Sequence, residues 1–182
     1  MIVRAVAGAA LPLAVVPWPI GAGPRYQPPA APPAIRAGRP VGLQRCGPDS
    51  TRFRIHFELF ANRRAIVIPA GIGVASPFRR VGADVRPGGC VYRLHTTTPT
   101  GVIRVGTRDA VLGDLFRVWG QMLGQRRLLT FSSLAGVRAF VNGTSRPGDP
   151  RTIRLQPHVQ IVLEIRGYVP PHAFFLFPKG TP

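Results

Sequence analysis

Alternation of apolar and polar residues in the middle of the chain predicts a hairpin of two strands. Between residues 52 and 59 (RFRIHFEL) the apolar side chains fall on every second position, with charged or polar side chains between them. A period of two places the apolar residues on one face of a half-buried strand. Residues 61–64 read as a turn, and residues 65–68 (AIVI) predict the returning strand. The hairpin therefore presents a row of polar side chains outward.

Further short strands are predicted along the chain. Their patterns occupy residues 90–94, 101–105, 137–141, 152–155 and 159–165. Asn142 and Gly143 predict a tight turn after the third of these strands. Residues 76–89 lack a period and contain several glycines and prolines, so we interpret them as a loop. Residues 125–136 are irregular in the same way.

One main helix is predicted from the apolar residues between positions 111 and 119, which have helical spacing. Thr107 or Asp109 is the expected N-cap, and Gly120 or Gly124 the expected end. A hairpin, connecting strands, one helix and more strands form the order of an α+β domain, with the helix across one face of a single mixed sheet. This order favours a β-grasp-like domain, and a small β-sandwich is the alternative.

The two ends of the chain differ from the predicted domain at residues 41–167. Residues 1–23 combine one early charge with an apolar run and small residues, as in a signal peptide or an uncleaved membrane anchor. Residues 24–40 are rich in proline and predict an extended, semi-rigid linker. Residues 168–182 form an aromatic, proline-rich tail. We expect its apolar side chains to be covered by the domain, a partner or a membrane; they are Phe174, Phe175 and Phe177.

The charge balance is strongly positive, with 24 basic and 7 acidic residues and a net charge of +17. A field of this sign attracts phosphate, anionic lipid or an acidic protein surface. All the basic residues except Lys179 are arginines, which fits bidentate recognition of carboxylate or phosphate but also the codon bias of a GC-rich genome. The arginines are spread over several predicted elements, which favours broad electrostatic docking. The candidate docking residues are Arg52, Arg54, Arg63, Arg64, Arg79, Arg80 and Arg104.

Few residues offer chemistry beyond charge. Cys46 and Cys90 are the two cysteines, and in an exported chain they predict a disulfide, with two separate buried thiols as the alternative. His56 and His95 are candidate copper or zinc ligands, although strand histidines commonly make only hydrogen bonds. The pattern contains no recognisable set of nucleophile, base and orienting acid. We therefore expect a protein without catalytic activity and without a cofactor.

Four motifs resemble a family of uncharacterised exported bacterial proteins. They lie at residues 69–73 (PAGIG), 90–96 (CVYRLHT), 101–103 (GVI) and 112–120 (LGDLFRVWG). The family carries a histidine-rich first strand, a PxxIGI turn, a CLYWLHTHD-like motif followed by SGVIHIE, and an FxxWG helix. The resemblance covers roughly residues 46–167 and implies export, but it implies no established activity.

This chain departs from that family at its histidines. Arg52, Arg54 and His56 occupy the strand that is histidine-rich in the family. The second histidine and the aspartate of the HTHD-like motif correspond to Thr97 and Thr98, and the histidine of the next strand corresponds to Arg104. If the family's histidines bind a metal, most of those ligands are replaced here.

Together these features predict an accessory subunit of the bacterial cell envelope, on the periplasmic or extracellular face. The expected partners are protein subunits of a membrane complex, such as a respiratory or photosynthetic one, and an anionic lipid surface. We expect no small-molecule substrate. Nucleic acid is also not expected, because Phe53 and Phe57 fall on the apolar face and not among exposed arginines. An exported copper or zinc protein and a basic nucleic-acid binder are the alternative functions.

Overall fold

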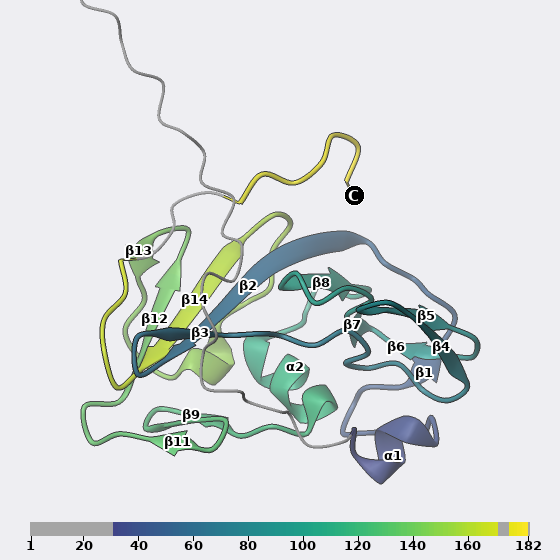
Figure 1. The fold of residues 1–182 in the computed structure, drawn as a ribbon, viewed down its shortest axis with the longest axis horizontal. Helices are drawn as coiled ribbons and strands as arrows, with labels where there is room; N and C mark the ends of the chain where they lie inside the picture. The colour runs from purple at the N-terminus through teal and green to yellow at the C-terminus, as the bar shows by residue number, and fades with distance from the viewer. Residues whose placement is uncertain (1–30, 171–174, 182) are drawn as a thin grey trace, which may run out of the picture.

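The computed structural model describes residues 31–170 and 175–181. Within these residues, seven strands form a central mixed sheet (Figure 1), namely β2 (Phe53–Ala61), β3 (Arg64–Ile66), β7 (Leu94–His95), β8 (Val102–Val105), β12 (Val137–Val141), β13 (Thr144–Ser145) and β14 (Gln160–Ile165). Their order is β13-β12-β14-β2-β8-β7, and β3 pairs with β2. The central strands β2 and β14 are parallel, and their other neighbours are antiparallel. The predicted α+β class is confirmed, but the expected single sheet is wrong, because three smaller sheets accompany the central one among the described residues.

The predicted first hairpin is confirmed as β2 and β3. Phe53, Ile55, Phe57 and Leu59 of β2 are all buried, as the period of two requires. Asn62 and Arg63 make the turn with positive φ angles of 53° and 62°. This conformation reverses the chain within two residues, so the pairing of β3 with β2 begins at once.

Helix α2 (Leu112–Trp119) is the predicted main helix, and it packs on the apolar face of the sheet. Its five buried residues are Leu112, Leu115, Phe116, Val118 and Trp119. Gly120 ends the helix in the left-handed conformation, with φ of 72°. The predicted N-cap is wrong: Val111 takes that position, and its backbone N–H donates to the Asp114 carboxylate at 3.2 Å. A first-turn carboxylate therefore replaces the expected side-chain cap.

Two segments differ from the sequence prediction. Residues 76–89, interpreted as a loop, contain an antiparallel hairpin of β4 (Phe78–Val81) and β5 (Asp84–Pro87). All four residues of β4 are exposed, so no apolar period marks that strand in the sequence. Of residues 152–155, predicted as a strand, Thr152 ends the 3-10 helix η1 (Pro150–Thr152), which Asp149 caps. Arg154 makes an isolated antiparallel bridge with Val111, so the predicted strand is reduced to that bridge.

The irregular segment after α2 forms a small three-stranded sheet of its own. Its strands are β9 (Leu123–Gly124), β10 (Arg127–Leu128) and β11 (Phe131–Ser132), in the order β11-β10-β9. Leu128 and Leu129 are buried in the main core. The small sheet is thereby fixed to the domain, while Arg126 and Arg127 are exposed.

The end of the predicted proline-rich linker packs on the domain. Residues 33–36 form the short helix α1 (Pro33–Arg36) and are not extended as expected. Ile35 is fully buried in the main core, and the Tyr92 hydroxyl donates to the Arg39 carbonyl oxygen at 2.5 Å. The contact gives this segment a fixed place against β6 (Val91–Tyr92).

The predicted disulfide is confirmed between Cys46 and Cys90. It joins β1 (Cys46–Gly47) to the residue before β6, and β1 and β6 also pair as antiparallel strands. Among the described residues there is no helix long and apolar enough to cross a membrane. The predicted leader at residues 1–23 and Phe174 lie outside the described residues.

Candidate functional site

Charged side chains gather on the face of the sheet opposite α2. The strand register places Arg104 of β8 between His95 of β7 and Arg54 of β2. Two residues along each strand, Gly106 lies between Arg93 and Arg52, as backbone hydrogen bonds from Gly106 to Arg93 and from Arg52 to Val105 indicate. Side chains two residues apart on a strand share a face. We name the surface of Arg52, Arg54, Arg93, Arg104 and Arg108 the arginine face.

The Asp49 carboxylate lies beside His95 and Arg104 of this surface. Its Oδ2 lies 3.6 Å from Nε2 of His95 and 3.8 Å from Nη1 of Arg104. Nδ1 of His95 lies 3.0 Å from the Tyr92 carbonyl oxygen, and because a carbonyl oxygen only accepts, Nδ1 carries a proton. Arg104 also donates through Nε to the Thr97 hydroxyl at 3.3 Å. These contacts hold His95 and Arg104 in place around Asp49.

The proton affinities at this site follow from burial and charge. Burial lowers the pKa of His95, and the charge of Arg104 acts in the same direction, while Asp49 and the Tyr92 carbonyl partly oppose them. Partial burial opposes ionisation of Asp49, but hydrogen bonds from Thr51 and the charges of His95 and Arg104 bring its pKa below the usual value. Burial and the neighbouring Arg104 also lower the pKa of Arg54. The site is therefore positively charged and only partly neutralised.

Arg54 has a buried donor that the described residues do not satisfy. It lies directly opposite Arg104 across β2 and β8, so two positive charges are adjacent. Its Nε is buried and makes no hydrogen bond within the described part of the chain. A buried donor without a partner costs free energy, on the order of 1–3 kcal/mol. The arginine face therefore keeps hydrogen-bonding capacity that the domain itself does not use.

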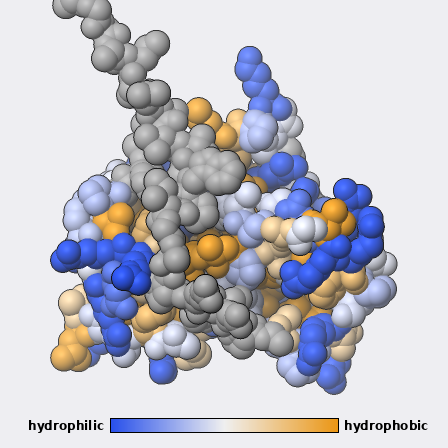
Figure 2. Space-filling model, viewed as in Figure 1, coloured by the Kyte–Doolittle hydropathy of each residue, from blue (hydrophilic) through white to orange (hydrophobic). Residues whose placement is uncertain are grey.

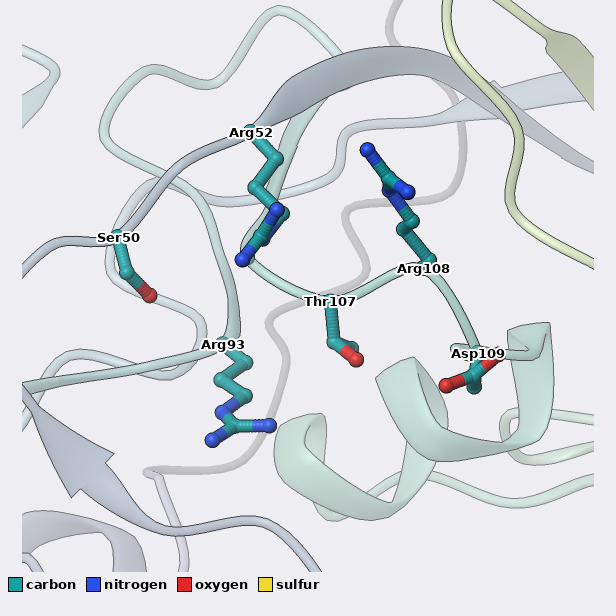
Figure 3. A pocket seen from close by; sticks show the side chains of 7 residues that line it. Ser50, Arg52, Arg93, Thr107, Arg108 and Asp109 are labelled. Carbon is teal, nitrogen blue, oxygen red and sulfur yellow. The ribbon is translucent and has the colours of Figure 1, made fainter.

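A polar pocket of about 470 Å³ opens beside this cluster (Figure 3). Its lining consists of Ser50, Arg52, Arg93, Gly106, Thr107, Arg108 and Asp109. The figure shows the Arg52 side chain extending from the start of β2 into the space between Ser50 and Thr107. The pocket thus combines three guanidinium groups with two hydroxyl groups and one carboxylate.

The other half of the same sheet face is covered by the C-terminal tail. The Phe175 ring stacks on the His56 ring, with centroids 3.9 Å apart and an interplanar angle of 7°. The Val169 N–H donates to Oε1 of Glu164 at 3.0 Å. Glu164 is buried, which raises its pKa above the ordinary value, although the Val169 N–H and Arg138 act against this. We name His56, Glu164 and the neighbouring Gln160, with the tail residues that contact the first two, the tail-covered half.

The structure brings together only some of the predicted docking residues. Arg52, Arg54 and Arg104 belong to the arginine face, whereas Arg63 and Arg64 lie at the far end of β2, in the turn and on β3. Arg79 and Arg80 lie on β4, well outside the pocket lining. The prediction missed Arg93 and Arg108. Arg93 was recognisable in principle, since it lies two residues before His95 on a strand-like segment.

The predicted metal ligands lie on one face but belong to different surroundings. His56 contacts Phe175, and its Nδ1 lies 3.5 Å from the Glu58 carboxylate. His95 contacts Asp49 and Tyr92 in the other half. Within the described residues, no group of three or more His, Cys, Asp or Glu side chains is close enough to hold a metal ion. Metal binding by His56 and His95 stays a prediction from the sequence.

Two of the three tail phenylalanines contact their own domain. Phe175 stacks on His56, and Phe177 lies against His158, with ring centroids 4.8 Å apart. Leu176 between them points outward and is 64% exposed. The tail therefore covers part of the sheet and still presents an apolar residue to the surroundings.

Comparisons with protein families, with curated proteins and with solved structures find no significant match to this chain. The resemblance to exported bacterial proteins stays a prediction from the sequence motifs. The argument for function therefore depends on the geometry and charge of this molecule alone.

Proposed function

We propose that this protein is a non-enzymatic accessory subunit of the bacterial cell envelope, and that it docks on an acidic surface of a larger membrane-associated protein assembly. The observation that carries the proposal is the β4–β5 hairpin. All four residues of β4 are exposed, and Arg79 lies directly opposite Arg86. Like charges in this position destabilise a hairpin. The stability of the isolated domain does not explain such a pair, but an acidic partner would neutralise it.

The composition of the hairpin also supports docking. Phe78 and Val81 are each 39% exposed, and the Arg80 guanidinium lies 5.9 Å from the centre of the Phe78 ring. Arg79, Arg80 and Arg86 form no ion pair with a carboxylate of the described residues. Figure 2 shows hydrophilic and hydrophobic side chains side by side at the right, where Figure 1 places β4 and β5. Arginine beside aromatic residues is typical of the energetic centres of protein interfaces.

The disulfide and the N-terminal sequence support export, and the strand order supports the proposed fold. A structural disulfide such as Cys46–Cys90 persists in an oxidising compartment, and residues 1–23 have the pattern of a signal or anchor. The parallel pair β2 and β14 has antiparallel strands on both sides and α2 on one face, an arrangement that favours a β-grasp-like domain. Sequencing the N-terminus of the mature protein, together with cell fractionation, tests export. Recovery in the cytosol with residues 1–23 intact contradicts an envelope location.

Charge reversal on the hairpin tests the docking. The full tagged chain is expressed in its source organism, and membranes are solubilised in mild detergent and resolved on a native gel. We expect the parent protein to migrate with a large assembly and to dissociate when salt screens the contact, at about 0.5 M. The variant Arg79→Glu/Arg80→Glu/Arg86→Glu should migrate alone. The control Arg126→Glu/Arg127→Glu, which changes exposed arginines on the small sheet, should migrate like the parent.

Two results would contradict docking on a protein. The parent protein migrating alone at low salt would show that no assembly holds it. Equal binding of the parent protein to protein-free phosphatidylglycerol vesicles and to native membranes would show that lipid is the partner. If the hairpin variant stays in the assembly, the contact must lie on another surface, and the proposed role of β4 and β5 is wrong.

A further inference from the structure

Part of the pocket wall beside the arginine face forms where Ser50 packs closely on the middle strand at Gly106. Gly106 follows β8 and lies between Arg93 and Arg52 on the two neighbouring strands. A Cβ atom on Gly106 would lie 2.8 Å from Oγ and 3.1 Å from the carbonyl oxygen of Ser50. Any larger residue would therefore displace Ser50, which lines the pocket. Gly106 thus allows Ser50 to lie against the backbone at a position that Arg93 and Arg52 flank.

The charges around this pocket are not neutralised by the domain. Arg52, Arg93 and Arg108 form no ion pair within residues 31–170 and 175–181, and Asp109 is the one carboxylate in the lining. In the adjacent row, Arg54 has a buried Nε without a hydrogen bond to a described residue, and Arg104 shares Asp49 with His95. The mutual repulsion of these arginines is relieved when an anion lies among them.

The donors around the pocket fit a phosphate group. Guanidinium groups bind phosphate oxygens through two parallel hydrogen bonds, and hydroxyl groups can donate to further oxygens. Figure 3 shows the Arg52 guanidinium between the hydroxyl groups of Ser50 and Thr107. A volume of about 470 Å³ is within the range of pockets for small organic ligands and exceeds what a single phosphate ion requires. A ligand consisting of a phosphate and a small attached group would fill it.

We propose that the pocket formed by Ser50, Arg52, Arg93, Gly106, Thr107 and Arg108 binds the phosphate group of a small phosphorylated ligand. The phosphate comes either from a soluble phosphate ester or from a lipid headgroup. The site is separate from the β4–β5 hairpin, because no hairpin residue lines the pocket. A negative result for phosphate binding here therefore does not contradict docking by the hairpin, and the reverse also holds.

Calorimetry on the full chain tests the proposal with inorganic phosphate and pyrophosphate as probes. We expect saturable binding that weakens about tenfold or more in Arg52→Gln and in Arg93→Gln, since each variant loses a charge-assisted hydrogen bond. Arg126→Gln removes the same charge from the small sheet and should bind like the parent. Thr107→Val tests a hydroxyl contact without altering the pocket volume, and a smaller loss is expected. In an NMR titration, the amide signals of Ser50, Gly106 and Thr107 should move first.

Vesicles distinguish the two sources of phosphate. Binding to phosphatidylglycerol vesicles that inorganic phosphate displaces, and that Arg52→Gln weakens more than Arg126→Gln does, would assign a lipid headgroup. Binding of inorganic phosphate and pyrophosphate without a matching effect on vesicles would assign a soluble ester. If neither probe binds, or if Arg126→Gln loses as much affinity as Arg52→Gln and Arg93→Gln, the pocket is not a phosphate site. Failure of the hairpin variant to dissociate from membranes would leave this result unaffected.

Discussion

The two halves of one sheet face differ in how far their polar side chains are exposed to solvent. In the tail-covered half, His56, Gln160 and Glu164 are buried; the Phe175 ring stacks on His56, and the Val169 N–H donates to Glu164. On the arginine face, the guanidinium groups of Arg52, Arg93 and Arg108 are exposed, and no segment of the described chain neutralises them. Buried polar atoms without a hydrogen bond to a described residue occur in both halves, namely Oε1 of Gln160 and Oε2 of Glu164 in one and Nε of Arg54 in the other. The halves therefore differ in exposure and in charge, and the arginine face carries the exposed positive charge. Exposed guanidinium groups without an ion-pair partner can bind an anionic ligand.

Removal of the disulfide should have the largest effect on this contrast. The bond fixes the segment that carries Asp49 and Ser50 over the arginine face. We expect Cys46→Ser/Cys90→Ser to lower the free energy of unfolding by about 2–4 kcal/mol, because the unfolded chain gains freedom. Urea denaturation measures the loss. Phosphate binding should weaken as well, whereas the stacking of Phe175 on His56 should persist. An unchanged midpoint would contradict the structural role of the bond.

Truncation of the tail aromatic should open the covered half. Phe175→Ala removes the ring that stacks on His56 and also the edge contact to Phe177. We expect a destabilisation of about 1 kcal/mol or somewhat more, since an aromatic pair contributes about 0.5–1.5 kcal/mol beyond its buried area. Thermal unfolding and hydrogen exchange at β14 measure it. Leu176→Ala, which alters the exposed neighbour, is the control; an equal effect of both variants would show that the stacking contributes nothing specific.

A glutamine in place of Glu164 should change the pH dependence of stability. Burial raises the pKa of Glu164 above its ordinary value of 4.5, so the folded protein holds this proton more tightly than the unfolded chain. The stability gained from the proton is complete below 4.5 and is lost as pH rises through the raised value. Glu164→Gln cannot lose a proton. Between about pH 4 and about pH 7, its free energy of unfolding should therefore rise relative to the parent. Parallel pH profiles in urea denaturation would contradict this.

The smallest expected effect concerns the proton on His95. The negative charge of Asp49 raises the pKa of His95 against the stronger effect of burial. Asp49→Asn removes that charge, so the pKa should fall further below the ordinary value. NMR titration of the His95 ring measures the shift. Because a lowered histidine pKa makes the fold less stable as pH falls below the ordinary value of 6.5, the variant should also lose more stability in acid. A rise in the pKa of His95 in this variant would show that the Asp49 carboxylate does not lie near His95 in solution.

Local sequence patterns predicted much of the fold. The period of two in β2, the helical spacing of α2, the turn at Asn142 and Gly143 and the Cys46–Cys90 pair were all predicted and confirmed. The β4–β5 hairpin was missed because Phe78, Arg79, Arg80 and Val81 are all exposed, and a strand without a buried face has no apolar period. The helix N-cap was misplaced because Asp114 satisfies the N–H of Val111 from within the first turn.

By itself, the sequence determined the first hairpin, the main helix and the excess of arginine, because these depend on neighbouring residues or on composition. Only the tertiary structure decided which arginines belong together. Arg52 and Arg54 are 39 or more residues from Arg93 along the chain, yet the register of β2, β8 and β7 places them around Gly106. Strand register depends on packing across the whole sheet, so the spacing of residues along one segment does not reveal it.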